Sequence, residues 1–196
     1  MTGPAEHQPQ YTAAEYFALE AQREVRHEFF EGEFFAIAGA GIAHNTIAQN
    51  FILKLRPALR GKNCRVQIEA VQLAVEESRH YTYPDVMVSC DPADQHKSQQ
   101  LHSPVLIVEV LSPSRGLKFN QYKKLPSLRH YLLVSQATWL VEWYQLTDYG
   151  AWAHTALAEA EDALAIPELG LAMTLAEGYE EAGVGPAKLD FGSEGR

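Results

Sequence analysis

The spacing of apolar residues predicts two helices in the first third of the chain. Apolar side chains recur at every fourth position from Ile47 to Leu55, the period of one helix face. Upstream, Thr12 and Glu15 have the spacing of a capping box, in which the hydroxyl and the carboxylate satisfy exposed N–H groups at a helix start. The two helices are expected over residues 12–22 and 43–59.

Alternation of apolar and polar residues predicts strands in much of the remaining chain. The pair Glu31-Gly32 lies between two aromatic-rich runs and predicts a tight hairpin, because Gly accepts the positive φ of such turns. Within 64–75 the alternation changes phase near Glu69-Ala70, which predicts one strand with a bulge. Further strands are expected over 85–89, 104–111, 128–136, 138–146 and 151–157, helices over 115–124 and 171–181, and a surface loop over 91–103.

The run Pro104–Leu111 is apolar except for Glu109. A segment so rich in Val, Leu and Ile is typical of a strand buried on both faces. An ionised carboxylate there costs several kcal/mol unless it is paired or bound to a metal. The sequence therefore predicts that a specific partner meets the charge of Glu109.

A second carboxylate, Asp85, follows Tyr83-Pro84 at the start of another predicted strand. If the two strands are neighbours, Asp85 and Glu109 can point into one site. Magnesium binds oxygen ligands and retains several waters, so two carboxylates and phosphate oxygens suit it. Lys118, expected on the next helix, would orient or activate the attacking water and offset charge developing on the phosphate.

Charge is unevenly distributed along the 196 residues, whose net charge is −9. Residues 156–196 carry nine acids and two bases, so the rest of the chain is close to neutral. That part contains two basic clusters, which could form a phosphate-binding face or simply solvated helix faces. The clusters are Lys54, Arg56, Arg60, Lys62 and Arg65, and then Arg115, Lys118, Lys123, Lys124 and Arg129.

Composition indicates an ordinary globular protein of one domain. The polar first ten residues lack the apolar core of a signal peptide, and no apolar run could span a bilayer, so we expect no membrane partner and a cytoplasmic location. Cys64 and Cys90 lack CxxC spacing, and we expect buried free thiols rather than a disulfide or a zinc site.

Four ordered segments together resemble the Uma-type endonucleases, a bacterial family of the PD-(D/E)XK nuclease superfamily. They are RHEFFEGEFFAIAGAGIAHN, YTYPDVMV, VLIVEVLSPS and RGLKFNQYKKLPSLRHYLLV. The resemblance covers about residues 11–181. It implies an α/β (α+β) restriction-endonuclease-like core, with a central mixed sheet flanked by helices. It also implies magnesium-dependent hydrolysis of DNA, with manganese as a substitute ion.

The resemblance also assigns roles to single residues. Pro84-Asp85 matches the PD element and Glu109 the second acid, which makes both of them metal ligands and catalytic residues. Glu28 matches a recurrent acid of the first segment and is a further catalytic candidate near the metal. His44 matches a recurrent histidine, which we expect to form hydrogen bonds at its helix start.

The chain departs from the family pattern around the lysine. Leu111 holds the place two residues after Glu109 where the superfamily carries Lys, and the resemblance moves that role to Lys118. Relatives have a longer connection where Ser114 here runs straight into Arg115. The shorter connection could displace Lys118 from Glu109.

We therefore expect a disordered segment 1–10, one nuclease-like domain over 11–181 and a mobile tail over 182–196. The leading function is a magnesium-dependent endonuclease acting on DNA. One alternative is a catalytically weak or inactive family member that serves as a nucleic-acid-binding module or as a homodimer formed through the aromatic-rich strand 139–146. Another is a hydrolase of a different phosphodiester.

Overall fold

A computed structural model describes residues 10–37, 39–68, 70–96, 99–111 and 118–187. Its centre is a mixed six-stranded sheet in which only one described pair, β8 and β9, runs parallel. This architecture confirms the predicted fold class. The strand order is β11 (Trp152–Leu157), β10 (Val141–Leu146), β9 (His130–Ser135), β8 (Pro104–Leu111), β6 (Val86–Ser89) and β3 (Arg65–Ile68).

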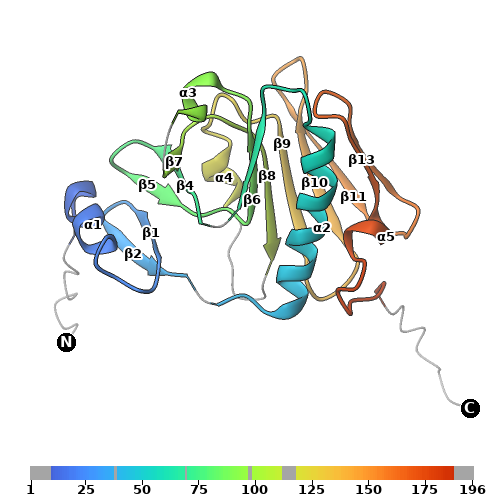
Figure 1. The fold of residues 1–196 in the computed structure, drawn as a ribbon, viewed down its shortest axis with the longest axis horizontal. Coiled ribbons are helices and arrows are strands. Elements are labelled where there is room, and N and C mark those ends of the chain that lie inside the picture. The colour runs from blue at the N-terminus through green and yellow to red at the C-terminus, as the bar shows by residue number, and fades with distance from the viewer. Residues whose placement is uncertain (1–9, 38, 69, 97–98, 112–117, 188–196) are drawn as a thin grey trace, which may run out of the picture.

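A smaller five-stranded sheet lies beside the central one, with α1 packed on it (Figure 1). Its order is β2 (Glu33–Ala36), β1 (His27–Phe30), β5 (His80–Thr82), β4 (Gln72–Glu76) and β7 (Gln100–Leu101). The remaining elements are the hairpin β12 (Ala163–Ile166) and β13 (Leu171–Thr174), and the helices α1 (Ala13–Glu20), α2 (Ile42–Ala58), α3 (Pro92–Gln95), α4 (Phe119–Tyr122) and α5 (Leu175–Gly178).

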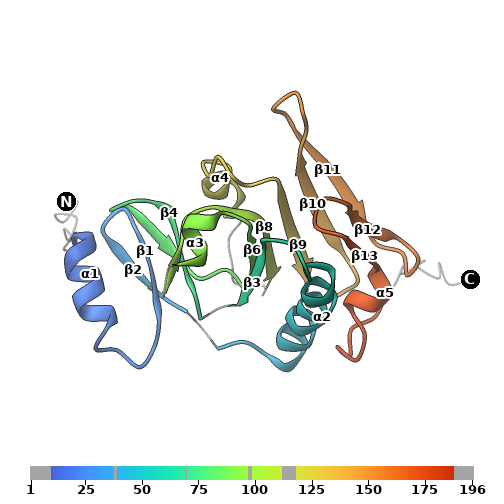
Figure 2. The same cartoon turned by 45° about the horizontal axis from the view of Figure 1, so that its top comes forward.

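Both faces of the central sheet are covered, with α2 and α4 on opposite sides (Figure 2). On one face Val86, Val108 and Leu132 pack against α2 and the β12–β13 hairpin. On the other face Met87 and Ile107 pack against α4 and the smaller sheet. This double burial explains why β8 is almost entirely apolar.

Several elements agree with the sequence prediction because local signals specify them. Thr12 and Glu15 form the capping box of α1. The hairpin of β1 and β2 turns at Glu31 and Gly32, both with positive φ. The four-residue period corresponds to α2, in which Ile47, Phe51 and Leu55 are buried.

The single bulged strand predicted over 64–75 is wrong. The structure divides it into β3 and β4, which belong to different sheets, with a turn in which Val71 N donates to Ile68 O. The change of phase that suggested a bulge is the point where the chain passes from one sheet to the other. Alternation continues on both sides of such a crossing, so periodicity alone does not separate it from a bulge.

One predicted helix is also corrected, and another is described only in part. The segment 171–181 begins as strand β13 and only then forms α5, because Leu171–Thr174 pairs with Ala163–Ile166. The helix predicted over 115–124 is described only as α4, and its first residues, 115–117, lie outside the described part. The loop 91–103 contains α3 and β7, apart from residues 97–98, which are not described.

Of the predicted terminal segments, 1–9 and 188–196 lie outside the described residues, and the domain boundaries stay a prediction. Within the described part of the expected tail, the carbonyls of Val184 and Gly185 accept hydrogen bonds from Trp139. None of the helices that the structure describes combines the length and the apolar character needed to cross a membrane.

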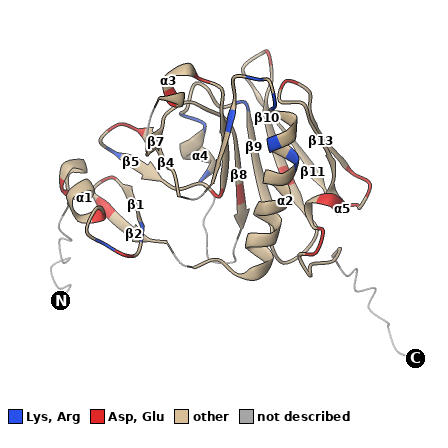
Figure 3. Ribbon diagram, viewed as in Figure 1, with Lys and Arg blue, Asp and Glu red and all other residues tan. Residues whose placement is uncertain are grey.

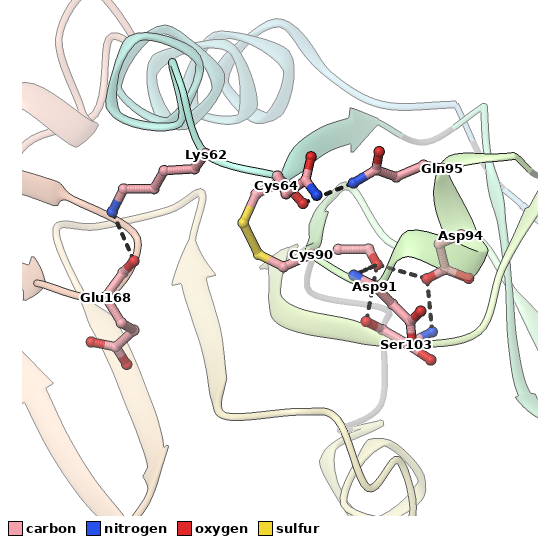
Figure 4. Close-up of a disulfide and its surroundings, with 10 residues drawn as sticks. Lys62, Cys64, Cys90, Asp91, Asp94, Gln95, Ser103 and Glu168 are labelled. Atoms are coloured by element: carbon pink, nitrogen blue, oxygen red, sulfur yellow. Dashed lines mark hydrogen bonds between the residues drawn. A yellow bond between two sulfur atoms is a disulfide. The ribbon is translucent and has the colours of Figure 1, made fainter.

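The expectation of free thiols is wrong, because Cys64 and Cys90 form a disulfide (Figure 4). Antiparallel pairing of β3 and β6 places Arg65 opposite Ser89, so the next residues outward, Cys64 and Cys90, also face each other. Their Cα atoms are 4.0 Å apart. Sequence spacing did not predict this bond, since only the strand register brings the two residues together.

Reduction of this disulfide should destabilise the fold. Closing a loop between residues separated by 26 positions contributes about 3.5 kcal/mol through the chain entropy of the unfolded state. Urea unfolding with and without dithiothreitol should show a loss of that order. The variant Cys64→Ala/Cys90→Ala is the control and should not respond to the reductant. An unchanged wild-type midpoint, with thiols shown to be reduced by alkylation, would contradict the prediction.

Candidate active site

The step Tyr83-Pro84-Asp85 joins the two sheets, since it follows β5 of the smaller sheet and leads into β6 of the central one. Proline holds its own φ near one value and keeps the preceding Tyr83 extended. The Oδ2 atom of Asp85 accepts a hydrogen bond from Val110 N at 2.7 Å. This bond fixes the carboxylate beside β8, one residue beyond Glu109.

Asp85 also meets His44, on the first turn of α2. The Nε2 atom of His44 lies 3.1 Å from Asp85 Oδ1, and both side chains are almost fully buried. We expected His44 to serve the start of its helix, but Gly41 is the N-cap residue and this ring nitrogen lies beside the carboxylate. The only sequence signal for this contact was its place in the family pattern.

Glu109 lies on the face of β8 that also carries Ile107 and packs against α4. It is 2% exposed, and its Oε1 atom accepts a hydrogen bond from the Tyr122 hydroxyl at 2.5 Å. Lys118 Nζ is 3.7 Å from the same oxygen. The buried carboxylate of Glu109 therefore has two partners from one short segment, the hydroxyl of Tyr122 and the ammonium group of Lys118.

Lys118 reaches the site from the N-cap position of α4, where its carbonyl accepts a hydrogen bond from Tyr122 N. Its Nζ atom donates to Glu28 Oε1 of β1 and to Thr82 Oγ1. The Thr82 hydroxyl in turn donates to Glu28 Oε1 at 2.6 Å. Lys118 therefore bridges a carboxylate of the smaller sheet and one of the central sheet.

The electrostatics of the site are those of buried carboxylates held near one another. Burial raises the pKa of Glu109, and the charges of Asp85 and Glu28 act in the same direction, while Lys118 and the Tyr122 hydroxyl oppose them. Carboxylates held together away from water repel each other, and a bound cation removes that repulsion. Burial also raises the pKa of Tyr122, which keeps this residue a hydrogen-bond donor.

The residues present suit magnesium by the chemistry of their donors. Among the described residues, no three His, Cys, Asp or Glu side chains are placed to enclose a metal ion by themselves. Magnesium does not require such a cage, because it keeps several waters and is usually held by one or two carboxylates and substrate phosphates. Asp85 and Glu109 would provide that pair of carboxylates.

The structure thus brings together all four residues singled out in the sequence, which come from four different elements and connections. They are Glu28, Asp85, Glu109 and Lys118. The shortened connection before Lys118 does not keep its ammonium group from Glu109. Thr82 was not identified from the sequence, and its only signal was its place just before Tyr83-Pro84-Asp85.

His80, at the start of β5, is a buried histidine whose protonation makes the stability of the fold depend on pH. It is 6% exposed, and its Nδ1 atom has no hydrogen-bond partner among the described residues. Burial lowers the pKa of His80 to about 4, with Lys118 and Lys124 acting in the same direction against Glu28 and Glu76. His80 is therefore neutral in the folded protein at neutral pH.

Folding stability should fall as the pH is lowered from about 6.5 to about 4. In this range the unfolded chain binds a proton at His80 and the folded protein does not, so the loss reaches about 3 kcal/mol. Urea unfolding across this range should show a shallower loss for His80→Gln than for the wild type. The exposed histidine variant His96→Gln is the control for removal of an imidazole. Equal slopes for His80→Gln and the wild type would contradict the assignment.

Comparison with known proteins identifies relatives over most of the chain. A family model described as "Uma2: Putative restriction endonuclease" matches residues 13–176. An uncharacterized protein of Synechocystis sp. is 33% identical over 172 residues, which cover 85% of this chain and 90% of that protein. A second uncharacterized protein of Synechocystis sp. is 37% identical over 153 residues, covering 74% and 86% of the two chains.

A solved structure has a similar fold. It is the crystal structure of "a putative nuclease belonging to DUF820" from Anabaena variabilis, with a TM-score of 0.63 and 15% sequence identity. The similarity covers 80% of this chain and 91% of that chain. At this level of identity the comparison concerns the fold alone.

Proposed function

Because the chain belongs to the Uma2 family, we propose that it is a magnesium-dependent endonuclease that hydrolyses phosphodiester bonds in DNA. The observation that carries the proposal is the convergence of Asp85 and Glu109 beside Lys118 in a site almost closed to water. Buried carboxylates beside an ammonium group cost folding free energy, and groups placed in this way serve phosphoryl transfer in metal-dependent enzymes.

Asp85 and Glu109 would hold the metal ion, which when bound polarises the phosphoryl group and lowers the pKa of a water ligand. The hydrogen bond from Val110 N fixes Asp85 before any metal binds. The hydroxyl of Tyr122 does the same for Glu109. Such fixed carboxylates need little rearrangement on binding, which favours a defined geometry.

Lys118 would stabilise negative charge on the phosphate as the attacking oxygen adds to phosphorus. Its ammonium group is held between Glu28 and Glu109 by contacts from both sheets, so it is oriented before substrate arrives. A fixed positive charge in a poorly hydrated site acts more strongly than the same charge in water. Thr82 supports this position through its hydrogen bonds to Glu28 and Lys118.

Removal of one metal-binding carboxylate should abolish cleavage. Plasmid DNA incubated with magnesium or manganese should be nicked by the wild type and not by Asp85→Asn, which keeps the size of the side chain and loses its charge. Calorimetric titration with manganese should show weaker binding for the same variant. The control Asp148→Asn neutralises an exposed acid in the β10–β11 turn and should leave both properties unchanged.

The proposal would be wrong if the purified wild type cleaved no nucleic acid with either metal, or if Asp85→Asn cleaved as well as the wild type. If the wild type cleaved no nucleic acid, the alternative of a protein that binds nucleic acid without cleaving it would be favoured.

Removal of the ammonium group should slow cleavage while metal binding persists. Lys118→Met should reduce the cleavage rate at saturating DNA by about 10²–10³-fold, the usual effect of losing one charge-stabilising donor. Urea unfolding of the variant separates this effect from loss of the fold. A rate close to that of the wild type would show that Lys118 only balances the charges of Glu28 and Glu109.

A further inference from the structure

A groove runs between α2 and β3, the edge strand of the central sheet. Its volume is about 520 Å³, and three arginines line it: Arg56, Arg60 and Arg65. Arg56 belongs to the last turn of α2, Arg60 follows the helix and Arg65 begins β3. We call this hollow the arginine groove. Figure 3 shows basic residues on the C-terminal half of α2.

A second hollow continues the arginine groove toward the candidate active site. It has a volume of about 250 Å³, and Asp85 and His44 line it. Ile52 of α2 and Ile68 of β3 line both hollows, which makes them neighbours along one path. The path starts at the carboxylate proposed to hold the metal and ends among the three arginines.

The sequence of α2 places the lining residues on one side of the helix. Asn45, Gln49, Ile52, Arg56 and Arg60 follow one another at intervals of three or four residues, the spacing of a single helix face. The fourteen helical residues from Asn45 to Ala58 rise about 20 Å, and Arg60 lies just beyond them. A B-form strand carries one phosphate every 3.4 Å along the axis, so this length corresponds to about six phosphates.

Among the described residues, Lys54 is the one base of this sequence cluster that forms an ion pair with a carboxylate. Lys54 pairs with Glu177 of α5, and Lys62 donates to the carbonyl of Glu168, as Figure 4 shows for Lys62. Arg65 donates to the carbonyl of Gln95. No carboxylate among the described residues forms an ion pair with Arg56, Arg60 or Arg65, so their positive charge is available to an anion.

We propose that the arginine groove binds the phosphate backbone of a nucleic-acid strand and leads it to Asp85. The inference rests on the proposed function for the position of the cleaved bond, but backbone binding by the arginines can be tested without cleavage. Exposed guanidinium groups suit phosphate oxygens, which they bind with two parallel hydrogen bonds. Contacts to phosphates carry no sequence information, so this groove determines affinity and strand position.

The path also explains how an acidic protein binds a polyanion. Nine of the acids lie in 156–196, and of these Glu177 pairs with Lys54 of α2 rather than with an arginine of the groove. Attraction to phosphate depends on the local field at the contact surface and falls off within about 10 Å at moderate salt. The net charge of −9 therefore does not oppose binding at the arginine groove.

The test is binding of the full-length protein to a fluorescent DNA duplex, measured by anisotropy over a range of salt concentrations without divalent metal. Single-stranded DNA and RNA of the same sequence form the parallel arms. The variant Arg56→Gln/Arg60→Gln should bind the preferred nucleic acid about a hundredfold more weakly, at about tenfold for each charged hydrogen bond lost. The slope of log K against log salt should decrease by about two.

Two control variants make the result specific. Arg129→Gln removes an exposed arginine that precedes β9 and should leave the slope unchanged. Arg56→Lys/Arg60→Lys keeps both charges and should retain most of the slope of log K against log salt. A difference in slope between the lysine and glutamine variants would therefore report the charges at these positions rather than damage to the fold. Arg65→Gln tests the third arginine and should lower the slope by about one.

The proposal is overturned if the arginine-to-glutamine variants bind with the affinity and slope of Arg129→Gln, or if the wild type binds none of the three nucleic acids. Asp85→Asn separates this result from the proposed function. If the wild type does not cleave but the glutamine variants lose binding, the arginine groove stands and the endonuclease proposal fails. If Asp85-dependent cleavage occurs and the glutamine variants bind like the control, only the arginine groove is rejected.

Discussion

The buried carboxylate of Glu109 is the constraint on which the surrounding structure depends. It lies in the middle layer of the molecule, on a strand covered on both faces, where an uncompensated charge would cost several kcal/mol. The Tyr122 hydroxyl and the Lys118 ammonium group meet it. Both come from the segment just after β8, so the same part of the chain introduces the charge and supplies its partners.

This arrangement links the two sheets. Lys118 contacts Glu28 of the smaller sheet and Glu109 of the central sheet, and Asp85 ends the connection between β5 and β6. The site therefore exists only when both sheets and α4 have packed together. Its electrostatics and the stability of the sheet junction are consequently coupled, and the low pKa of His80 reflects the same burial.

The proposed metal site and the arginine groove would have different roles, the first in cleavage and the second in binding the strand, and their physical environments differ accordingly. The metal site is nearly closed to water, where a few fixed charges act strongly on the reacting atoms. The arginine groove is exposed, and its charges would act on a longer strand through many weaker contacts. Helix α2 joins them, because His44 near its start touches Asp85 and Arg56 near its end lines the groove.

The sequence by itself determined the features that local chemistry specifies. The capping box at Thr12, the turn at Glu31-Gly32 and the helical period of α2 each depend on residues a few positions apart, and all were predicted correctly. The anomalous Glu109 and the Pro-Asp step also identified the carboxylates that meet in the site, with Lys118 expected on the next helix, and the family resemblance added Glu28.

Only the tertiary structure decided which distant residues become neighbours. Strand register brought Cys64 to Cys90, and the crossing between sheets divided one predicted strand into β3 and β4. The helix face of Arg56 and the edge of β3 formed a groove that composition had indicated only as a basic cluster. Such contacts depend on how whole elements pack. The residue pattern within one helix or strand does not specify which other element will pack against it.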